Sequence, residues 1–338
     1  MAVRERRQTV LRVIVEDYIT RAVPVASNAI VDRYGLNVSP ATIRNDTAYL
    51  EQEGYVIRPH HSAGSVPTDK AYRYYVELLG QDIDLPDAER YLIHRAFQEA
   101  EEELEQWLKT LAAFLARLVH NLVVITSPKA VRCRLQHLDL VALQDFMALL
   151  VVVLYEARVR RQVLPLSRKV SQDELTSLAN KLTSLYSGMT GTEILAEMEG
   201  LPPEERQISQ CLAEVIAAED KLEHGEPYVE GLRLLLSQPE LMNSPRMLGI
   251  LEALEGEDWL KGMSCQEFSR GGVKVVIGEE NQEPALQDLS LIASRYGVLD
   301  KASGIVGVVG PKRMDYARAI SSLNCLTALL SNSVAEYV

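Results

Sequence analysis

The sequence contains no apolar run long enough to cross a lipid bilayer. The run from Phe146 to Tyr155 is about half of the roughly 20 residues that a spanning helix needs, and it is typical of a buried strand. The first ten residues, MAVRERRQTV, lack the apolar core of a signal peptide. Together these absences predict a cytoplasmic protein without a membrane segment.

Cysteine is scarce, and the motifs of common enzyme classes are missing. The four cysteines are far apart and form no C-x-x-C pair, so we expect reduced thiols and neither a disulfide framework nor a zinc site. The sequence has no nucleophile elbow, no P-loop, no dinucleotide fingerprint and no H-E-x-x-H motif. The run GIVGVVGP (304–311) is more typical of a strand packed against a helix than of a phosphate loop. We therefore expect no enzyme and no cofactor.

Negative charge dominates the chain, yet the first 80 residues do not share it. The 338 residues are enough for two or three domains, 47% of them are hydrophobic, and the formal net charge is −12. Residues 1–80 carry ten basic and nine acidic side chains, whereas the remainder carries 25 basic and 38 acidic ones. This asymmetry permits nucleic-acid binding by the N-terminal segment without requiring it.

Residues 38–54, VSPATIRNDTAYLEQEG, have the signals of a short helix with two different faces. Ser39 is a favourable N-cap, Pro40 suits the first helical position, and Gly54 can end the helix. At 100° per residue, the inward face comprises Ile43, Asp46, Thr47 and Leu50. The outward face and its flanks comprise Ala41, Thr42, Arg44, Asn45, Ala48, Tyr49 and Gln52.

The outward face is small, hydrogen-bonding and weakly cationic. These properties suit a helix in the major groove of DNA, where Asn45 can pair with adenine and Arg44 with guanine or phosphate. An ordinary solvated helix has a similar face, so the neighbouring elements must decide. Periodicity predicts two preceding helices, residues 3–22 and 27–34, with Gly35 after the second. Three such helices are typical of a helix-turn-helix unit.

A short hairpin is predicted directly after the third helix. Residues 55–58 are strand-like, residues 59–65 (PHHSAGS) are turn-rich, and Thr68 is expected to cap a following helix. A hairpin in this position is typical of the wing of a winged-helix domain. The two histidines have no third ligand nearby, so we expect no metal site there. The predicted DNA-contacting residues are therefore Ser39, Ala41, Thr42, Arg44, Asn45, Tyr49, Arg58, His60, His61 and Gly64.

These segments also carry a resemblance to a known family. SPATIRND, LEQEGYV and PHHSAGSVPTDKAYRYYV, in this order, resemble the HrcA family of heat-inducible transcription repressors. VKVVIGEEN, LSLIASRYGV and GIVGVVGPKRMDYARAI resemble that family's C-terminal half, so the resemblance covers nearly the whole chain. Ser65 stands where the family usually has an arginine, and His61 stands where a threonine is common; both positions lie in the wing.

Beyond a polar break at residues 81–86, helical and strand-like segments alternate. Residues 87–121 are expected to be helical, with a leucine seam over 104–118 that either packs on its own domain or forms a coiled coil. A mainly helical block follows, with helices expected at 172–186, 204–223, 239–249 and 251–260, and a final helix is expected at about 314–330. Strands are predicted at 122–126, 138–143, 146–155, 157–164, 231–236, 273–277, 289–293 and 304–309.

This order suggests a sheet domain with a helical insertion, although two separate domains fit the pattern equally well. The resemblance implies the first arrangement, an α+β fold with a winged helix (1–80), a GAF-like antiparallel sheet domain (87–170 and 263–338) and a mainly helical inserted dimerising domain (171–262). We expect the dimer contact in that insertion, through the apolar segments 212–216 and 232–236, unless these form its own core.

The resemblance further implies what the protein does. It implies a homodimer that binds double-stranded DNA at an inverted-repeat operator, the CIRCE element of chaperone operons. It also implies that the GroEL chaperonin keeps this homodimer active. The alternative is a transcription factor that senses a small molecule in its GAF-like domain, which a polar-lined pocket there would favour. A metabolic enzyme with a structural helix-turn-helix is a further rival, and the missing catalytic motifs count against it.

Overall fold

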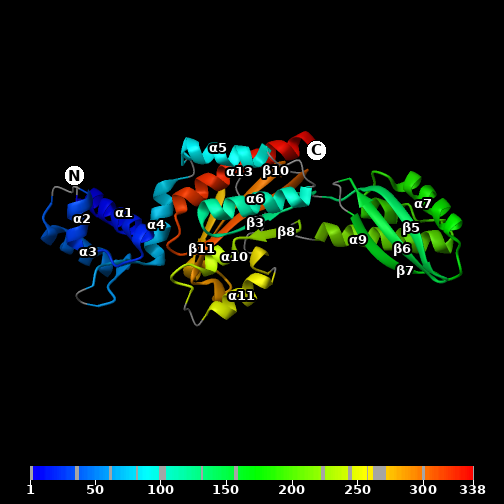
Figure 1. Ribbon diagram of the computed structural model, residues 1–338. Helices are drawn as coiled ribbons and strands as arrows, with labels where there is room; N and C mark the ends of the chain where they lie inside the picture. Colours follow the sequence, from blue (N-terminus) through cyan, green and yellow to red (C-terminus); the bar gives the residue numbers. More distant parts are fainter. Residues whose placement is uncertain are drawn as a thin grey trace. The chain divides into compact units, whose positions relative to one another are not determined.

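The computed structural model describes residues 3–34, 38–60, 63–80, 83–98, 104–130, 132–155, 159–221, 225–242, 246–256, 258–261, 272–298 and 301–337. None of the helices in these ranges is long and apolar enough to cross a membrane. The chain divides into two compact units (Figure 1). The first comprises Met1–Ser127, Glu226–Tyr296 and Gly304–Ser333, and the second comprises Pro128–Gly225, Gly297–Ser303 and Val334–Val338.

The first unit begins with a winged helix-turn-helix, as predicted. Its elements are α1 (Val3–Arg21), α2 (Ser27–Tyr34), α3 (Pro40–Gln52), the antiparallel pair β1 (Val56–Ile57) and β2 (Val66–Pro67), and α4 (Asp69–Leu79). The apolar stripe of α1 supplies the core, since Val10 and Ile14 are fully buried beside Ile30 of α2 and Ile43 of α3. Thr68 is the N-cap residue of α4, as predicted, but its side chain makes no capping hydrogen bond. Its hydroxyl donates instead to the Gly54 and Tyr55 carbonyls.

The rest of the first unit contains an antiparallel sheet; the short β4, and the residues of β11 that pair with it, belong to the second unit. Among the described residues the order of this sheet is β8-β3-β11-β10-β9, and β4 pairs with β11. The strands are β3 (Leu122–Thr126), β4 (Lys129–Ala130), β8 (Pro227–Glu230), β9 (Val273–Ile277), β10 (Leu289–Val298) and β11 (Ala302–Pro311). Every residue of β3 is buried, because helices cover both faces of this strand.

The helices of this unit are α5 (Asp87–Gln98), α6 (Leu104–Val119), α10 (Leu232–Leu236), α11 (Met247–Glu255), α12 (Asp258–Lys261) and α13 (Tyr316–Tyr337). The leucine seam of α6 packs on its own domain, since Leu108, Leu111 and Leu115 are buried and the helix contacts β3. Before α5, residues 83–86 have no regular structure, and the rest of the predicted 81–86 break lies outside the described residues.

The second unit has a three-stranded antiparallel sheet covered by helices. The strands are β5 (Leu135–Gln144), β6 (Met147–Leu154) and β7 (Val159–Pro165), in that order. The helices are α7 (Gln172–Tyr186), α8 (Gly191–Ala196) and α9 (Pro203–Lys221). Alternate residues of β6, from Ala148 to Leu154, join Leu175, Leu182 and Leu212 in one apolar core. Ser171 and Thr190 start α7 and α8 with capping boxes.

This division differs from the predicted boundaries of the insertion. The strands predicted at 138–164 pair only with one another and share their core with α7 and α9, so they lie in the insertion. The predicted strand at 231–236 is wrong, because β8 ends at Glu230 and α10 begins at Leu232. Of the apolar segments predicted to hold the dimer, Leu212 and Ile216 are buried in the core of the second unit and Leu235 in that of the first, whereas Leu232 is exposed.

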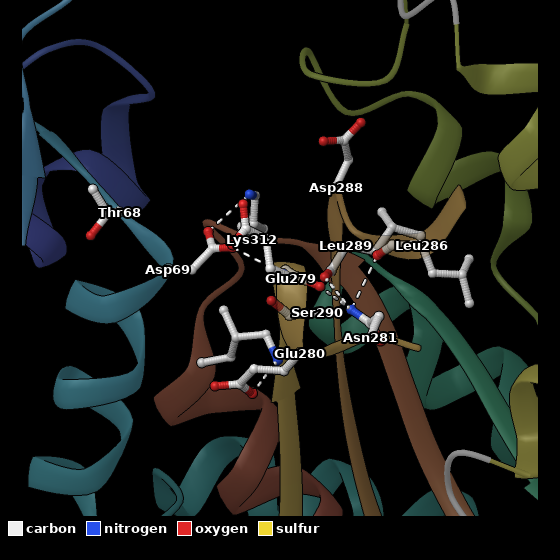
Figure 2. A network of polar contacts seen from close by, with 12 residues as sticks. Thr68, Asp69, Glu279, Glu280, Asn281, Leu286, Asp288, Leu289, Ser290 and Lys312 are labelled. Carbon is white, nitrogen blue, oxygen red and sulfur yellow. Dashed lines mark hydrogen bonds and ion pairs between the residues drawn. The ribbon is translucent and has the colours of Figure 1, made fainter. Parts of the chain in front are cut away.

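Polar contacts attach α4 to the sheet of the same unit (Figure 2). The Asp69 carboxylate accepts a hydrogen bond from the Glu279 backbone N–H (3.1 Å) and pairs with the Lys312 ammonium (2.8 Å). One turn later, Arg73 pairs with Glu280, which lies in the 3-10 helix Gly278–Glu280. The first two turns of α4 are thus tied to the connection after β9.

Candidate nucleic-acid interface

The sequence of α3 holds this helix at both ends. The Ser39 side chain accepts a hydrogen bond from the Thr42 backbone N–H at 3.2 Å, and Pro40 occupies the first turn. After the last helical residue, Gly54 adopts a φ of +76°, which glycine tolerates without steric cost. Both predicted boundaries of the helix are therefore confirmed. The start and the end of α3 are therefore fixed by its own sequence and do not depend on DNA.

The two faces of α3 also follow the predicted pattern. Its buried residues are Ile43, Asp46, Thr47 and Leu50. Asn45 and Arg44 are exposed, and neither side chain makes a hydrogen bond or ion pair within the described residues. Thr42 is half-buried, and the remaining predicted contacts on this helix, Ser39, Ala41 and Tyr49, are exposed. The outward face is therefore available for a partner over its whole length.

A polar cavity of about 250 Å³ lies on one flank of α3, where the wing meets the start of α2. Three of the predicted contacts line it: Arg44 from α3, Arg58 from the strand end of the wing, and Gly64. Ser27 and Asn28 add polar groups from the first turn of α2. Arg58 also pairs with Glu51 at 3.4 Å, which neutralises part of its charge. The cavity thus joins two guanidinium groups beside the exposed helix face.

A backbone bridge holds the wing against the turn between α1 and α2. Val25 and Ser65 exchange two N–H···O hydrogen bonds of 2.9 Å, and Ser65 is buried. Gly64 lies so close to this bridge that an added Cβ would be 2.5 Å from the Val25 carbonyl carbon and 2.6 Å from Pro24. Gly64 is therefore required for close packing. His60 is exposed at the tip, and His61 lies outside the described residues.

Gly64→Ala should displace the wing. The new methyl group would meet backbone atoms that cannot rotate away, so we expect a loss of about 1–3 kcal/mol in the free energy of unfolding, as for other overpacked sites. Urea unfolding measures this loss, and fluorescence anisotropy with duplex DNA measures the accompanying loss of affinity. Ala63→Ser, at a neighbouring cavity position, is the matched control. Unchanged unfolding of Gly64→Ala would contradict the close packing.

Sequence reasoning did not identify one cluster beside this surface. Asp46, on the buried face of α3, accepts hydrogen bonds from Arg6 and Arg7 of α1, and the Arg7 guanidinium lies over the Tyr49 ring. Hydrogen bonding to Asp46 raises the pKa of Arg6 above its ordinary value. A signal was present, because a carboxylate on an apolar stripe needs a partner and the chain begins with several arginines.

A helix-turn-helix with a wing, an exposed polar helix face and flanking arginines define a DNA-binding transcription regulator. Comparison with known proteins identifies the kind. The profile of the HrcA protein C terminal domain matches residues 105–320, and that of the DeoR-like helix-turn-helix domain matches residues 18–68. This chain belongs to the HrcA family.

Individual relatives agree with this assignment. The heat-inducible transcription repressor HrcA of Dehalococcoides mccartyi is 41% identical over 98% of this chain and 96% of its own length. That of Chloroflexus aggregans is 36% identical over 98% of this chain and 93% of its own length. A crystal structure of a hypothetical protein has the same fold, with a TM-score of 0.65 at 22% identity, covering 98% and 99% of the two chains. The family consists of transcription repressors, so the protein is a regulator and not an enzyme.

Proposed function

We propose that this protein represses heat-shock genes by binding an inverted-repeat operator as a homodimer. The exposed face of α3 carries the proposal, because its two flanks hold arginines and Asn45 at its centre has no partner among the described residues. In this proposal Asn45 and Ala41 face the bases of the major groove, and Tyr49 contacts DNA from one flank of the helix. Arg44, Arg58, His60 and Gly64 contact the sugar-phosphate backbone on the wing side. His61, which lies outside the described residues, stays a predicted contact. Ser39 and Thr42 hold and border the start of this helix.

The homodimer is supported by an apolar surface of the second unit. On β6 the residues opposite the core, Met147, Leu149, Val151 and Val153, form a stripe, and Leu149 pairs with Val141 of β5 and Val163 of β7. Val141, Val159 and Val163 are each more than 40% exposed. Asp139 and Arg161, the cross-strand neighbours of Val151, are the charged residues beside this stripe. An exposed apolar stripe with charged residues beside it is typical of a protein–protein interface. A second copy of the chain, placed by two-fold symmetry, covers this surface with the same residues. We call the surface formed by Met147, Leu149, Val151 and Val153 with Val141, Val159 and Val163 the β6 face.

Three further parts of the proposal follow from the family. The operator is the CIRCE element of chaperone operons, and the GroEL chaperonin keeps the repressor in its DNA-binding form. When unfolded proteins occupy the chaperonin, free repressor loses this support and transcription rises. Because a repressor acts at the chromosome, we place the protein in the cytoplasm.

The rival function, sensing of a small molecule by the sheet domain, has less support. The core cluster of that domain is built from apolar side chains, among them Leu122, Ile250 and Trp259. A polar-lined pocket in this domain would favour a small-molecule ligand. The cluster around Leu122, Ile250 and Trp259 is instead packed with apolar side chains.

Electrophoretic mobility shift with two duplexes tests the proposed function. We expect the protein to bind an inverted-repeat CIRCE duplex at least about 10³-fold more tightly than a scrambled duplex of the same composition. Prior incubation with GroEL and ATP should raise the bound fraction, and GroEL loaded with an unfolded protein should not. Equal affinity for both duplexes would contradict operator recognition, and an unchanged bound fraction would contradict the chaperonin step.

A further inference from the structure

The cavity described above accounts for only one flank of the recognition helix. At 100° per residue, Arg44 and Tyr49 point about 140° apart, on opposite sides of the face that contains Asn45. Arg44 faces the wing and its cavity. A helix in the major groove, which is about 12 Å wide, has a sugar-phosphate backbone on each side. Cationic groups on the wing side can therefore bind the phosphates of one DNA strand. The side of the helix that carries Tyr49 faces the phosphates of the other strand.

Two arginines of α1 occupy the Tyr49 side. Arg6 donates to both carboxylate oxygens of Asp46, from Nε at 2.6 Å and from Nη2 at 3.1 Å. Arg7 donates from Nε to the same carboxylate at 3.3 Å. The Asp46 side chain is only 3% exposed, whereas those of Arg6 and Arg7 are 21% and 32% exposed. The buried carboxylate thus holds two cations whose outer edges reach solvent.

The orientation of Arg7 is fixed from a second direction. Its guanidinium carbon lies 3.7 Å from the centroid of the Tyr49 ring, a cation–π contact. In the described part of the chain the two terminal nitrogens of Arg7 have no hydrogen-bond partner. Their N–H groups are donors of the planar kind that matches phosphate oxygens. Arg7 is therefore held in one orientation beside Tyr49 of α3, and its terminal N–H groups remain available to donate to a phosphate.

A purely structural ion pair does not account for both arginines. Arg6 alone satisfies the two oxygens of Asp46 and balances its charge. Arg7 leaves the cluster with a net positive charge next to the recognition helix, and a buried carboxylate needs no second guanidinium for neutrality. An excess of charge held in one geometry is what a binding site for an anion requires.

We propose that Arg6 and Arg7 form a second phosphate-binding site, for the DNA backbone that borders the major groove on the side away from the wing. Asp46 is its positioning residue, and Tyr49 orients Arg7. The site rests on the proposed function, since it requires α3 to enter the groove. The two flanks of the helix would then each hold one strand, which fixes the helix in the groove independently of base sequence.

Arg7→Gln tests the site through the salt dependence of binding. We expect it to weaken binding to CIRCE and scrambled duplexes by the same factor at 50 mM salt. Each lost phosphate contact lowers the slope of log affinity against log salt by about 0.9, so the difference from wild type should shrink about three- to fourfold by 200 mM. Arg7→Lys keeps a point charge and should retain most of the slope. Arg12→Gln, on the same helix, is the control, since Arg12 pairs with Glu16 and is 55% exposed.

A scan with single methylphosphonate groups, which remove one phosphate charge at a time, locates the contact. Arg7→Gln should abolish the sensitivity of one strand, and Arg44→Gln that of the other strand in the same half-site. An unchanged salt slope for Arg7→Gln would overturn the site, as would loss of sensitivity on the same strand for both variants. A lowered melting temperature with a wild-type slope would also overturn it, because the pair would then be structural only. Failure of the wild-type protein to bind either duplex would instead refute the proposed function.

Discussion

Removing the insertion should leave a monomer that binds the inverted repeat roughly 10²–10⁴-fold more weakly than the wild-type protein. One winged helix contacts one half-site, and joining two of them makes the second contact intramolecular. The loss of the β6 face therefore costs far more affinity than the loss of any single side chain. The affinity for an isolated half-site should be unchanged.

The structure shows where to cut. β3 and β8 are antiparallel neighbours, Thr126 pairs with Pro227, and the Ser127 N–H donates to the Glu226 carbonyl at 2.8 Å. Replacing Pro128–Gly225 by Asn-Gly converts the two strands into an ordinary hairpin, since this dipeptide favours the type I′ turn. A cut at the predicted boundary, residue 171, would instead leave β5, β6 and β7 without the helices that cover them.

Point variants separate the β6 face from the rest of the insertion. Val151→Arg places a charge in the middle of the stripe, between Asp139 and Arg161, and should shift the protein to monomer in sedimentation velocity. Its circular dichroism spectrum should stay that of the folded protein, because the Val151 side chain lies on the face of β6 opposite the core. Leu195→Arg is the matched control, since Leu195 is an exposed apolar residue of α8 outside the sheet. A dimer that persists in both Val151→Arg and the deletion would place the interface outside the insertion.

Asn45→Ala should reduce operator affinity by about 1–3 kcal/mol and relax the preference at one base pair in each half-site. Asn45 lies at the centre of the exposed face, and its amide can donate to and accept from an adenine edge. Arg44→Ala should weaken CIRCE and scrambled duplexes alike, because a phosphate contact carries no sequence information. The two variants are therefore each other's control.

Competition binding with single-base-pair variants of the duplex distinguishes these roles. The Asn45→Ala protein should bind one of the substituted duplexes as tightly as it binds the unsubstituted operator. The wild-type protein should bind that same duplex more weakly than the operator. If Asn45→Ala lost the same affinity for the scrambled duplex as for the operator, the base-reading role would be refuted. Neither side chain is buried, so both variants should unfold at the wild-type midpoint.

The sequence by itself determined the elements whose signals are local. α2 and α7 span the predicted residues 27–34 and 172–186, and α3 begins and ends where Ser39, Pro40 and Gly54 predicted. Capping and helical hydrogen bonds join residues within four positions of each other, so a short stretch of sequence specifies them. The same periodicity predicted which face of α3 is buried, and the wing followed from its turn residues.

Only the tertiary structure decided which distant segments meet. The strand β3 pairs with β8 across the whole insertion, and no local pattern distinguishes that pairing from one with β5, so the predicted division of the chain differed from the observed one. Gly64 reads as a flexible wing tip, and only the approach of Pro24 reveals that it must be glycine. In the sequence Asp46 is a carboxylate on an otherwise apolar helix face, with no partner in view. In the folded chain α1 places Arg6 and Arg7, about 40 residues earlier, within hydrogen-bond distance of it. The physical reason is the same in each case: strand partners, close backbone approaches and ion pairs depend on the position in space of residues that are remote in the chain.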